Sequence, residues 1–183
     1  QPSGKNAVIV ENNGYVESEF DFDASTGTIT SYNGYATYMA IPETLGGAPV
    51  KAIGPEAFAH HTYLALLELP EGLETIGDSA FYNAYKSSIL ELPEGLEHIG
   101  AYAFYFAGIK GFLTLPEGLK TIGESAFESC SNMGGNLYLP STLESIGSRA
   151  FKGDYNIQYI VLESLTAPTL GEDVFAGCDY LYD

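Results

Sequence analysis

The sequence predicts a solenoid in which about six short repeats stack side by side and share one parallel β-sheet. A phenylalanine recurs at a nearly constant spacing of 23, 23, 23, 24 and 24 residues, at Phe58, Phe81, Phe104, Phe127, Phe151 and Phe175. The motif Leu-Pro-Glu-Gly-Leu, followed by Ile-Gly and Ala-Phe, recurs over residues 69–81, 92–104 and 115–127. A period in the twenties is typical of solenoids, because one such unit cannot bury its apolar face alone.

The chain of 183 residues is long enough for one domain with a sizeable core, and it is strongly acidic. Aspartate and glutamate number 24 against seven lysines and arginines, which gives a net charge of −17. Such a surface repels phosphate backbones and anionic lipid and attracts cations, so we expect no nucleic-acid partner. No apolar run approaches the roughly 20 residues that span a bilayer, so we expect no membrane insertion.

Residues 1–40 lack the repeat and are predicted to form a β-hairpin cap over the first coil. Short strands are expected at 7–10, 19–22, 28–30 and 35–41, with turns at 12–14, 25–27 and Asn33-Gly34. An Asn-Gly pair between β-rich runs favours a hairpin, because a type I′ turn needs positive φ at both central positions. A solenoid needs a cap because an exposed apolar end would aggregate. The predicted domains are a cap over 1–40 and a solenoid over 41–183.

Each later unit is predicted to contain two extended pieces and a turn. A strand carrying Leu-x-Leu ends at proline, which cannot continue a hydrogen-bonded ladder. The Leu-x-x-Ile-Gly stretch gives a second, shorter extended piece. The x-x-Ala-Phe stretch is expected to form a helical or 3₁₀ turn, led by a polar residue such as Asp78 or Ser148. The first unit opens at 41–44 and carries an additional loop over 45–49.

The full pattern, Leu-Pro-x-x-Leu-x-x-Ile-Gly-x-x-Ala-Phe-x-x-Cys, resembles the BspA-type leucine-rich repeat of bacterial surface proteins. Residues 25–30 and 41–47 are similar to the opening repeat of members from gut Firmicutes, and 167–175 resembles the closing repeat. The resemblance covers about residues 25–183 and implies a right-handed leucine-rich-repeat solenoid, a β-rich β/α superhelix. It also implies a non-enzymatic, secreted protein of the bacterial cell surface that has lost its signal peptide and mediates adhesion.

The third residue after each recurring phenylalanine is predicted to point into the core. These residues are His61, Ala84, Ala107, Cys130, Asp154 and Cys178. Cys130 and Cys178 lie two repeats apart, so strands about 4.8 Å apart place their Cα atoms about 10 Å apart, beyond the roughly 7 Å that a disulfide allows. We therefore expect two buried free thiols. Asp154 interrupts the row and needs a backbone partner or a bulge, because an unpaired buried carboxylate is costly.

The sequence carries no recognisable catalytic or cofactor-binding motif. His60, His61 and His98 lack the spacing of a metal site, so we expect them to be repeat-edge or exposed side chains. No base is placed beside either cysteine, and no nucleophile elbow, phosphate loop or dinucleotide fingerprint is present. We predict a protein that is not an enzyme and uses no cofactor.

Three equivalent glutamates, Glu71, Glu94 and Glu117, follow the proline in successive units. Stacked coils would place them about 5 Å apart, where they repel one another. A weak calcium site is one interpretation. The sequence lacks a calcium-loop pattern, so solvated charges are the favoured interpretation.

The outward residues of the Leu-x-Leu segments form the predicted binding surface, called here the Leu-x-Leu face. The residue between the leucines and the residue before them point away from the core. The predicted ligand contacts are Leu66, Glu68, Ile89, Glu91, Phe112, Thr114, Tyr138 and Tyr159. A sheet face so rich in apolar and tyrosine side chains is typical of a contact surface for protein or glycan.

A second aromatic cluster flanks the recurring phenylalanines and consists of Tyr82, Tyr85, Tyr102, Tyr105 and Phe106. Either this cluster binds a ligand, or its rings pack against one another between coils and are not available to a ligand.

Three functions fit the sequence. The first is binding to a host extracellular-matrix protein or another surface protein through the Leu-x-Leu face. The second is glycan binding, with tyrosines stacking on sugar rings. The third is a spacer that holds another domain away from the cell wall. Alanine at Phe112, Tyr138 and Tyr159 separates them, because a spacer would lose no ligand.

Overall fold

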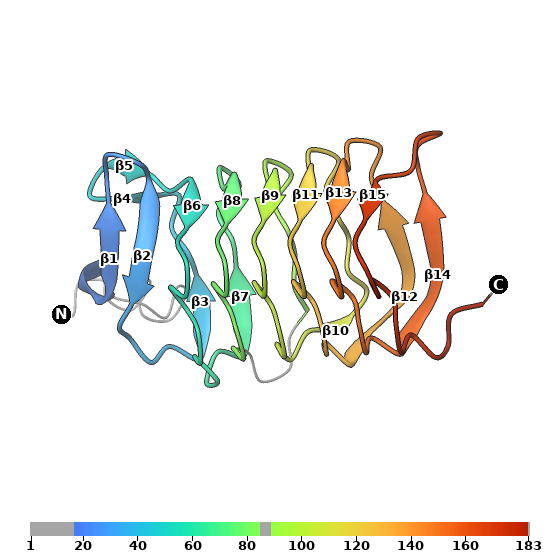
Figure 1. Cartoon of the computed structure of the whole chain (residues 1–183). Helices are drawn as coiled ribbons and strands as arrows, with labels where there is room; N and C mark the ends of the chain where they lie inside the picture. Colours follow the sequence, from blue (N-terminus) through green and yellow to red (C-terminus); the bar gives the residue numbers. More distant parts are fainter. Residues whose placement is uncertain (1–16, 85–88, 183) are drawn as a thin grey trace.

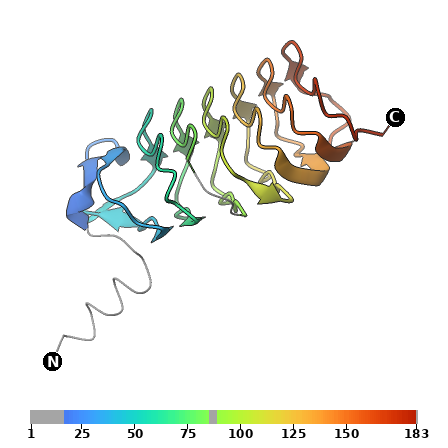
Figure 2. The same ribbon diagram turned by 90° about the horizontal axis from the view of Figure 1, so that it is seen from below.

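The computed structural model describes residues 17–84 and 89–182, which form one stack of coils (Figure 1). Figure 2 shows the coils side by side along one axis, with β1 and β2 near one end and the C-terminus at the other. A 3₁₀ turn at Glu17–Glu19 precedes the first strand. An eight-stranded sheet runs the length of the stack in the order β1-β2-β6-β8-β9-β11-β13-β15. Its strands are β1 Phe20–Asp23, β2 Thr28–Tyr32, β6 Ala52–Ile53, β8 Thr75–Ile76, β9 His98–Ile99, β11 Thr121–Ile122, β13 Ser145–Ile146 and β15 Thr169–Leu170.

The Ile-Gly piece of the motif builds this long sheet. Each two-residue strand pairs in parallel with its equivalent in the next coil, as Ile76 does with Ile99, and both of these side chains are buried. The following glycine allows the close stacking. A Cβ on Gly123 would lie 2.4 Å from the backbone nitrogen of Ala101, a separation that no side chain tolerates.

The Leu-x-Leu segments form a second, interrupted side of the stack, so the expected single parallel sheet is wrong. Here β3 (Tyr38–Ala40) pairs with β7 (Leu66–Glu68), and β10 (Lys110–Gly111), β12 (Asn132–Leu139) and β14 (Asn156–Leu162) form a separate parallel sheet. Residues 90–92 and 113–115 are not strands. Their leucines Leu90 and Leu113 are nevertheless buried. The apolar pattern therefore fixes side-chain burial but not backbone pairing.

The x-x-Ala-Phe stretch does not form the expected helical or 3₁₀ turn. It forms successive tight turns in which residues four positions apart, such as Ser79 and Asn83, have φ of 54° and 49°. Their N–H groups donate to the next coil, from Ser79 to the Ala101 carbonyl and from Asn83 to the Tyr105 carbonyl, both at 2.8 Å. In a helix these N–H groups would bond within the same segment. The turns thus join one coil to the next.

The recurring phenylalanines form one continuous stack through the core. Centroid distances between successive rings from Phe58 to Phe175 are 5.0, 5.2, 5.2, 5.3 and 5.6 Å, with interplanar angles of 18° or less. Tyr32 extends the stack towards the N-terminus, with its ring 5.3 Å from that of Phe58. The repeat therefore brings together side chains that cannot be buried within one coil.

Near the N-terminus, β1 and β2 form an antiparallel hairpin closed by residues 24–27. A second small hairpin joins β4 (Thr44–Leu45) to β5 (Ala48–Pro49). The expected hairpin at Asn33-Gly34 is wrong, because β2 pairs in parallel with β6 and β3 pairs in parallel with β7. The strand expected at 7–10 and the turn at 12–14 lie outside the described residues. The cap function of 1–40 and the boundary at residue 40 stay predictions.

Candidate binding surface

Seven of the eight predicted contact side chains are solvent-exposed. The exposed fraction is 53% for Ile89, 73% for Phe112, 46% for Tyr138 and 47% for Tyr159. Glu68, Glu91 and Thr114 are exposed as well. Nothing is described for the side chain of Leu66. The other side chains are exposed because successive residues of an extended chain point to opposite sides, and the neighbouring leucines point into the core. A binding role for these residues stays a prediction.

The C-terminal half of the Leu-x-Leu face carries an aromatic patch, defined as Phe112, Tyr138, Tyr159 and Tyr182. The Phe112 ring lies against Gly135, where a Cβ would come within 2.2 Å of it. Gly135 has a φ of 83° and adjoins a shift in register between β12 and β14. This local irregularity gives the exposed ring a flat backbone support.

The tyrosines of the aromatic patch are held by neighbours on the same face. Tyr138 lies opposite Val161 in the ladder between β12 and β14, and Tyr159 lies opposite Asn136. The Tyr159 ring stacks on Tyr182 with a centroid distance of 5.2 Å. No tyrosine stands at the equivalent position of the earlier repeats, so the repeat pattern did not predict this contact.

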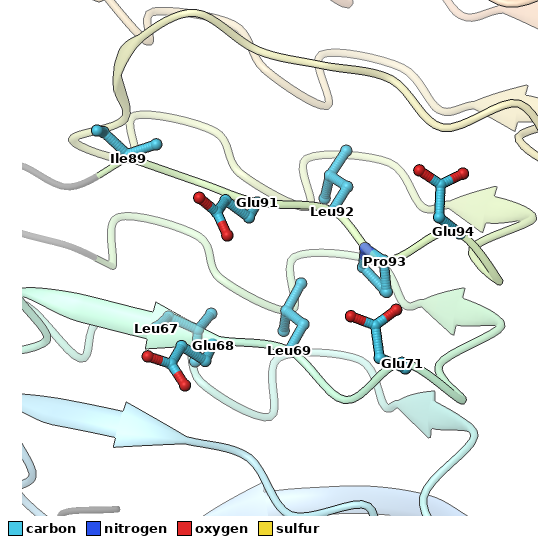
Figure 3. A pocket seen from close by; sticks show the side chains of 9 residues that line it. All are labelled: Leu67, Glu68, Leu69, Glu71, Ile89, Glu91, Leu92, Pro93 and Glu94. Carbon is cyan, nitrogen blue, oxygen red and sulfur yellow. The ribbon is translucent and has the colours of Figure 1, made fainter. Parts of the chain in front are cut away.

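Between the second and third coils the face is hollowed into an open groove of about 480 Å³, called here the acidic groove (Figure 3). Its lining residues are Leu67, Glu68, Leu69, Glu71, Ile89, Glu91, Leu92, Pro93 and Glu94. In Figure 3 the carboxylates form two pairs, Glu68 with Glu91 and Glu71 with Glu94, and leucines from both coils lie between the pairs. The groove coincides with the interruption of the sheet beyond β7.

The four groove carboxylates have little compensation from the rest of the described chain. The ion pairs of the described residues join Lys51 to Glu74, Lys120 to Glu97 and Arg149 to Glu124, and none of them reaches the groove. His98 Nε2 lies 3.8 Å from Glu97 Oε2, also away from the groove. The Tyr38 hydroxyl donates to Glu68 Oε1 at 3.1 Å, and this hydrogen bond raises the pKa of Tyr38.

Equivalent glutamates in neighbouring coils are better satisfied. Glu43 accepts a hydrogen bond from the Glu71 backbone N–H at 2.8 Å. Glu117 accepts one from the Ser141 hydroxyl at 3.0 Å, which lowers the pKa of Glu117. The side chains of Glu71, Glu91 and Glu94 accept no hydrogen bond from any described residue.

The second aromatic cluster is largely used in packing between coils. Tyr82 and Tyr105 stack with a centroid distance of 5.1 Å and an angle of 8°, and both are half-buried. The Tyr102 hydroxyl donates to Glu124 Oε1 at 3.1 Å. Phe106 alone among the described members is exposed, and Tyr85 lies outside the described residues. The arrangement favours the packing interpretation for the tyrosines.

The predicted inward row is buried from Ala84 to Cys178, whereas His61 is only half-buried. Both cysteines are free and buried, as expected. Their thiols donate to carbonyls of earlier coils, from Cys130 to Phe104 at 3.2 Å and from Cys178 to Phe151 at 3.3 Å. Burial raises the pKa of Cys130 well above its usual value and that of Cys178 to about 11, so neither is an activated nucleophile.

Asp154 is fully buried, and neither of its carboxyl oxygens has a hydrogen-bond partner among the described residues. The expected backbone partner is therefore not found there. Burial raises the pKa of Asp154 to about 9, and the charge of Glu128 acts in the same direction. The backbone of Cys130 opposes this shift without meeting the geometry of a hydrogen bond. At neutral pH the carboxyl is protonated, which removes the cost of a buried charge.

The histidines make local contacts. His61 Nδ1 lies 3.2 Å from the Ala59 carbonyl, His98 Nδ1 lies 2.9 Å from Thr121 Oγ1, and the His60 ring packs edge-on against Tyr82. Across the part of the chain that the structure describes, no three His, Cys, Asp or Glu side chains are grouped to hold a metal ion. Within the same ranges, no helix has the length and apolarity needed to cross a lipid bilayer.

The structure resembles solved leucine-rich-repeat proteins. The T. pallidum leucine-rich-repeat protein TpLRR superposes with a TM-score of 0.71 at 24% identity, over 92% of this chain and 91% of that one. A leucine-rich cell-surface protein of Faecalibacterium prausnitzii A2-165 gives a TM-score of 0.50 at 22% identity, over 84% of this chain and 55% of that one. At these identities the likeness shows the fold alone.

Comparison at the sequence level identifies the family. No functionally curated protein matches the chain significantly. The model of the BspA-type leucine-rich repeat region matches residues 49–182 in six copies. The spacing of the stacked phenylalanines agrees with this count of repeats. The chain therefore belongs to the BspA-type leucine-rich repeat family.

Proposed function

We propose that this chain is a non-enzymatic protein-interaction scaffold of the bacterial cell surface. In this proposal its Leu-x-Leu face binds a host extracellular-matrix protein or another surface protein. The observation that carries the proposal is the aromatic patch, where large rings are exposed although a folded chain normally buries them. Support for the location comes from the named cell-surface protein of F. prausnitzii, which shares the fold.

The contacts that hold the rings of the aromatic patch in place favour a binding role. Aromatic side chains are enriched at the centres of protein interfaces, where they contribute large contact areas. Phe112 lies on Gly135 and Tyr159 stacks on Tyr182, so these rings are partly ordered before any ligand arrives. Such pre-organisation lowers the entropy lost on binding.

The test is biosensor binding to a panel of host matrix proteins. The face variant is Phe112→Ala/Tyr138→Ala/Tyr159→Ala, and the control is Phe106→Ala/Leu165→Ala, whose side chains are exposed elsewhere. We expect saturable binding that the face variant loses and the control keeps, with unchanged melting temperatures. Equal binding by all three proteins would refute the assignment to this face.

Glycan binding is the second candidate, and the exposed tyrosine rings of the patch favour it. Rings of this kind present apolar surface and a hydroxyl together. If the matrix panel is negative, a glycan array with the same variants is the test. Loss of a sugar signal in the face variant would support the glycan function. Failure to bind in both assays would leave a spacer function.

A further inference from the structure

We infer that the acidic groove binds the cationic side chains of an extended, lysine- or arginine-bearing segment of the protein partner. The inference rests on the proposed function, because it assigns partner chemistry to the N-terminal part of the same Leu-x-Leu face. Aromatic contacts at one end of the face and cation contacts at the other would then act on a single ligand.

The groove fits lysine and arginine side chains, which combine an apolar stem with a charged head. Leu69 and Leu92 are half-buried and give the groove apolar surface between its carboxylates (Figure 3), while Leu67 and Pro93 of the lining are buried. Lysine and arginine place an apolar stem on such surface while the charged head stays in contact with water and anions. A volume of about 480 Å³ accommodates more than one side chain.

The charge of the groove favours cationic ligands. Glu68, Glu71, Glu91 and Glu94 carry four negative charges on two adjacent coils, and no cation of the described chain forms an ion pair with any of them. A bound cation relieves their mutual repulsion. One exposed ion pair contributes about 0–1 kcal/mol, so several carboxylates and the apolar stem must act together.

The spacing of the two carboxylate pairs indicates two cations. Glu68 and Glu71 are three residues apart on one coil, as are Glu91 and Glu94 on the next. Three residues of fully extended chain would span about 10 Å, and the turns that begin at Glu71 and Glu94 make the separation of the two pairs shorter than this. Lysines two residues apart on an extended segment point to the same side and lie about 7 Å apart, within reach of both pairs through their flexible stems.

Other ligand classes fit the groove less well. Calcium needs about six to eight oxygen ligands, and no described group of three acidic side chains converges on one point. Phosphates and other anions are repelled, and a neutral sugar leaves the four charges uncompensated.

The experiment uses a fluorescein-labelled peptide, Gly-Lys-Leu-Lys-Gly, followed by fluorescence anisotropy with the full chain. A second peptide replaces both lysines by norleucine and keeps only the apolar stems. The groove variant is Glu91→Gln/Glu94→Gln, which keeps side-chain shape. The matched control is Glu144→Gln/Glu172→Gln, which removes the same charge from exposed positions that do not line the groove.

We expect the lysine peptide to bind and the norleucine peptide not to bind. The groove variant should raise the peptide Kd about tenfold, which corresponds to about 1.4 kcal/mol. The control should change it less than twofold. Equal weakening in both variants would show general attraction to an acidic surface and overturn the inference, as would absence of binding to the wild-type chain.

The proposed function is tested separately. If a matrix protein binds and the Phe112/Tyr138/Tyr159 variant loses it while the groove variant keeps it, the face binds protein and the groove inference is wrong. If the lysine peptide binds only through the groove and no protein of the panel binds, the groove inference stands and the matrix-protein proposal fails.

Discussion

Replacing Asp154 by alanine should stabilise the protein by an amount that grows as pH rises. The folded chain holds this carboxyl at a pKa of about 9, whereas its ordinary value is 3.8. Between these two values the folded state keeps a proton that the unfolded state has released. The stabilising effect of the proton is complete below about pH 4 and is lost as pH rises through about 9.

The magnitude follows from the linkage between proton binding and folding. One pH unit corresponds to about 1.4 kcal/mol for a single proton, so the rise from pH 4 to pH 7 costs the wild type on the order of 4 kcal/mol. Alanine has no proton to lose, and Ala84 and Ala107 already occupy the equivalent position in two other coils, fully buried. Any cavity left by the substitution is independent of pH.

The assay is urea unfolding of both proteins at pH 4, 5.5, 7 and 8.5, with slopes compared to verify that the same cooperative unit unfolds. The quantity of interest is the difference in unfolding free energy between variant and wild type at each pH. Asp179→Ala is the control, because Asp179 is exposed near the same end of the stack. A difference that stays flat from pH 4 to 8.5 would show that Asp154 is ionised in the folded state, and would refute the reasoning.

Three further predictions concern the core and the face. Phe104→Ala removes the middle of the ring stack and should cost about 3–5 kcal/mol in chemical unfolding, and a loss below 1 kcal/mol would contradict the stack's importance. Gly135→Ala should lower the melting temperature more than Gly47→Ala. Both glycines have φ near 80°, but only Gly135 lies against the Phe112 ring. Equal effects of the two substitutions would refute that contact. Both thiols should react with a thiol reagent only after denaturation, so rapid labelling of the native chain would contradict their burial.

Side-chain periodicity predicted the parts of the fold that depend on burial. Phe81 and Phe104 recur in register, and rings in register can be buried only by stacking coil on coil. The same reasoning placed Cys130 in the core and Phe112 on the surface. These results depend only on which side of the chain a residue faces.

Backbone pairing could not be predicted in the same way. Ala-Phe stretches resemble helical turns in composition, yet Ser79 and Asn83 adopt positive φ and donate their N–H groups to the next coil. The long sheet uses two-residue strands such as Thr75–Ile76, which are too short to show an alternating pattern.

The acidic groove and the Tyr159–Tyr182 stack were missed for a related reason. The groove lies where residues 90–92 do not extend the sheet beyond β7, and no residue of the motif signals that interruption. The Tyr182 ring stacks on Tyr159 from a position where the earlier repeats carry no tyrosine. Both features arise from tertiary arrangement, and the repeat pattern carries no information about it.

Photocrosslinking from the aromatic patch tests the central claim most directly. p-Benzoylphenylalanine replaces Phe112 in one protein and the exposed Leu165 in another, and each is irradiated with the matrix protein that binds best in the panel. If the Leu-x-Leu face binds the partner, a covalent adduct forms from position 112 and not from position 165. An adduct from position 165 alone would contradict the account.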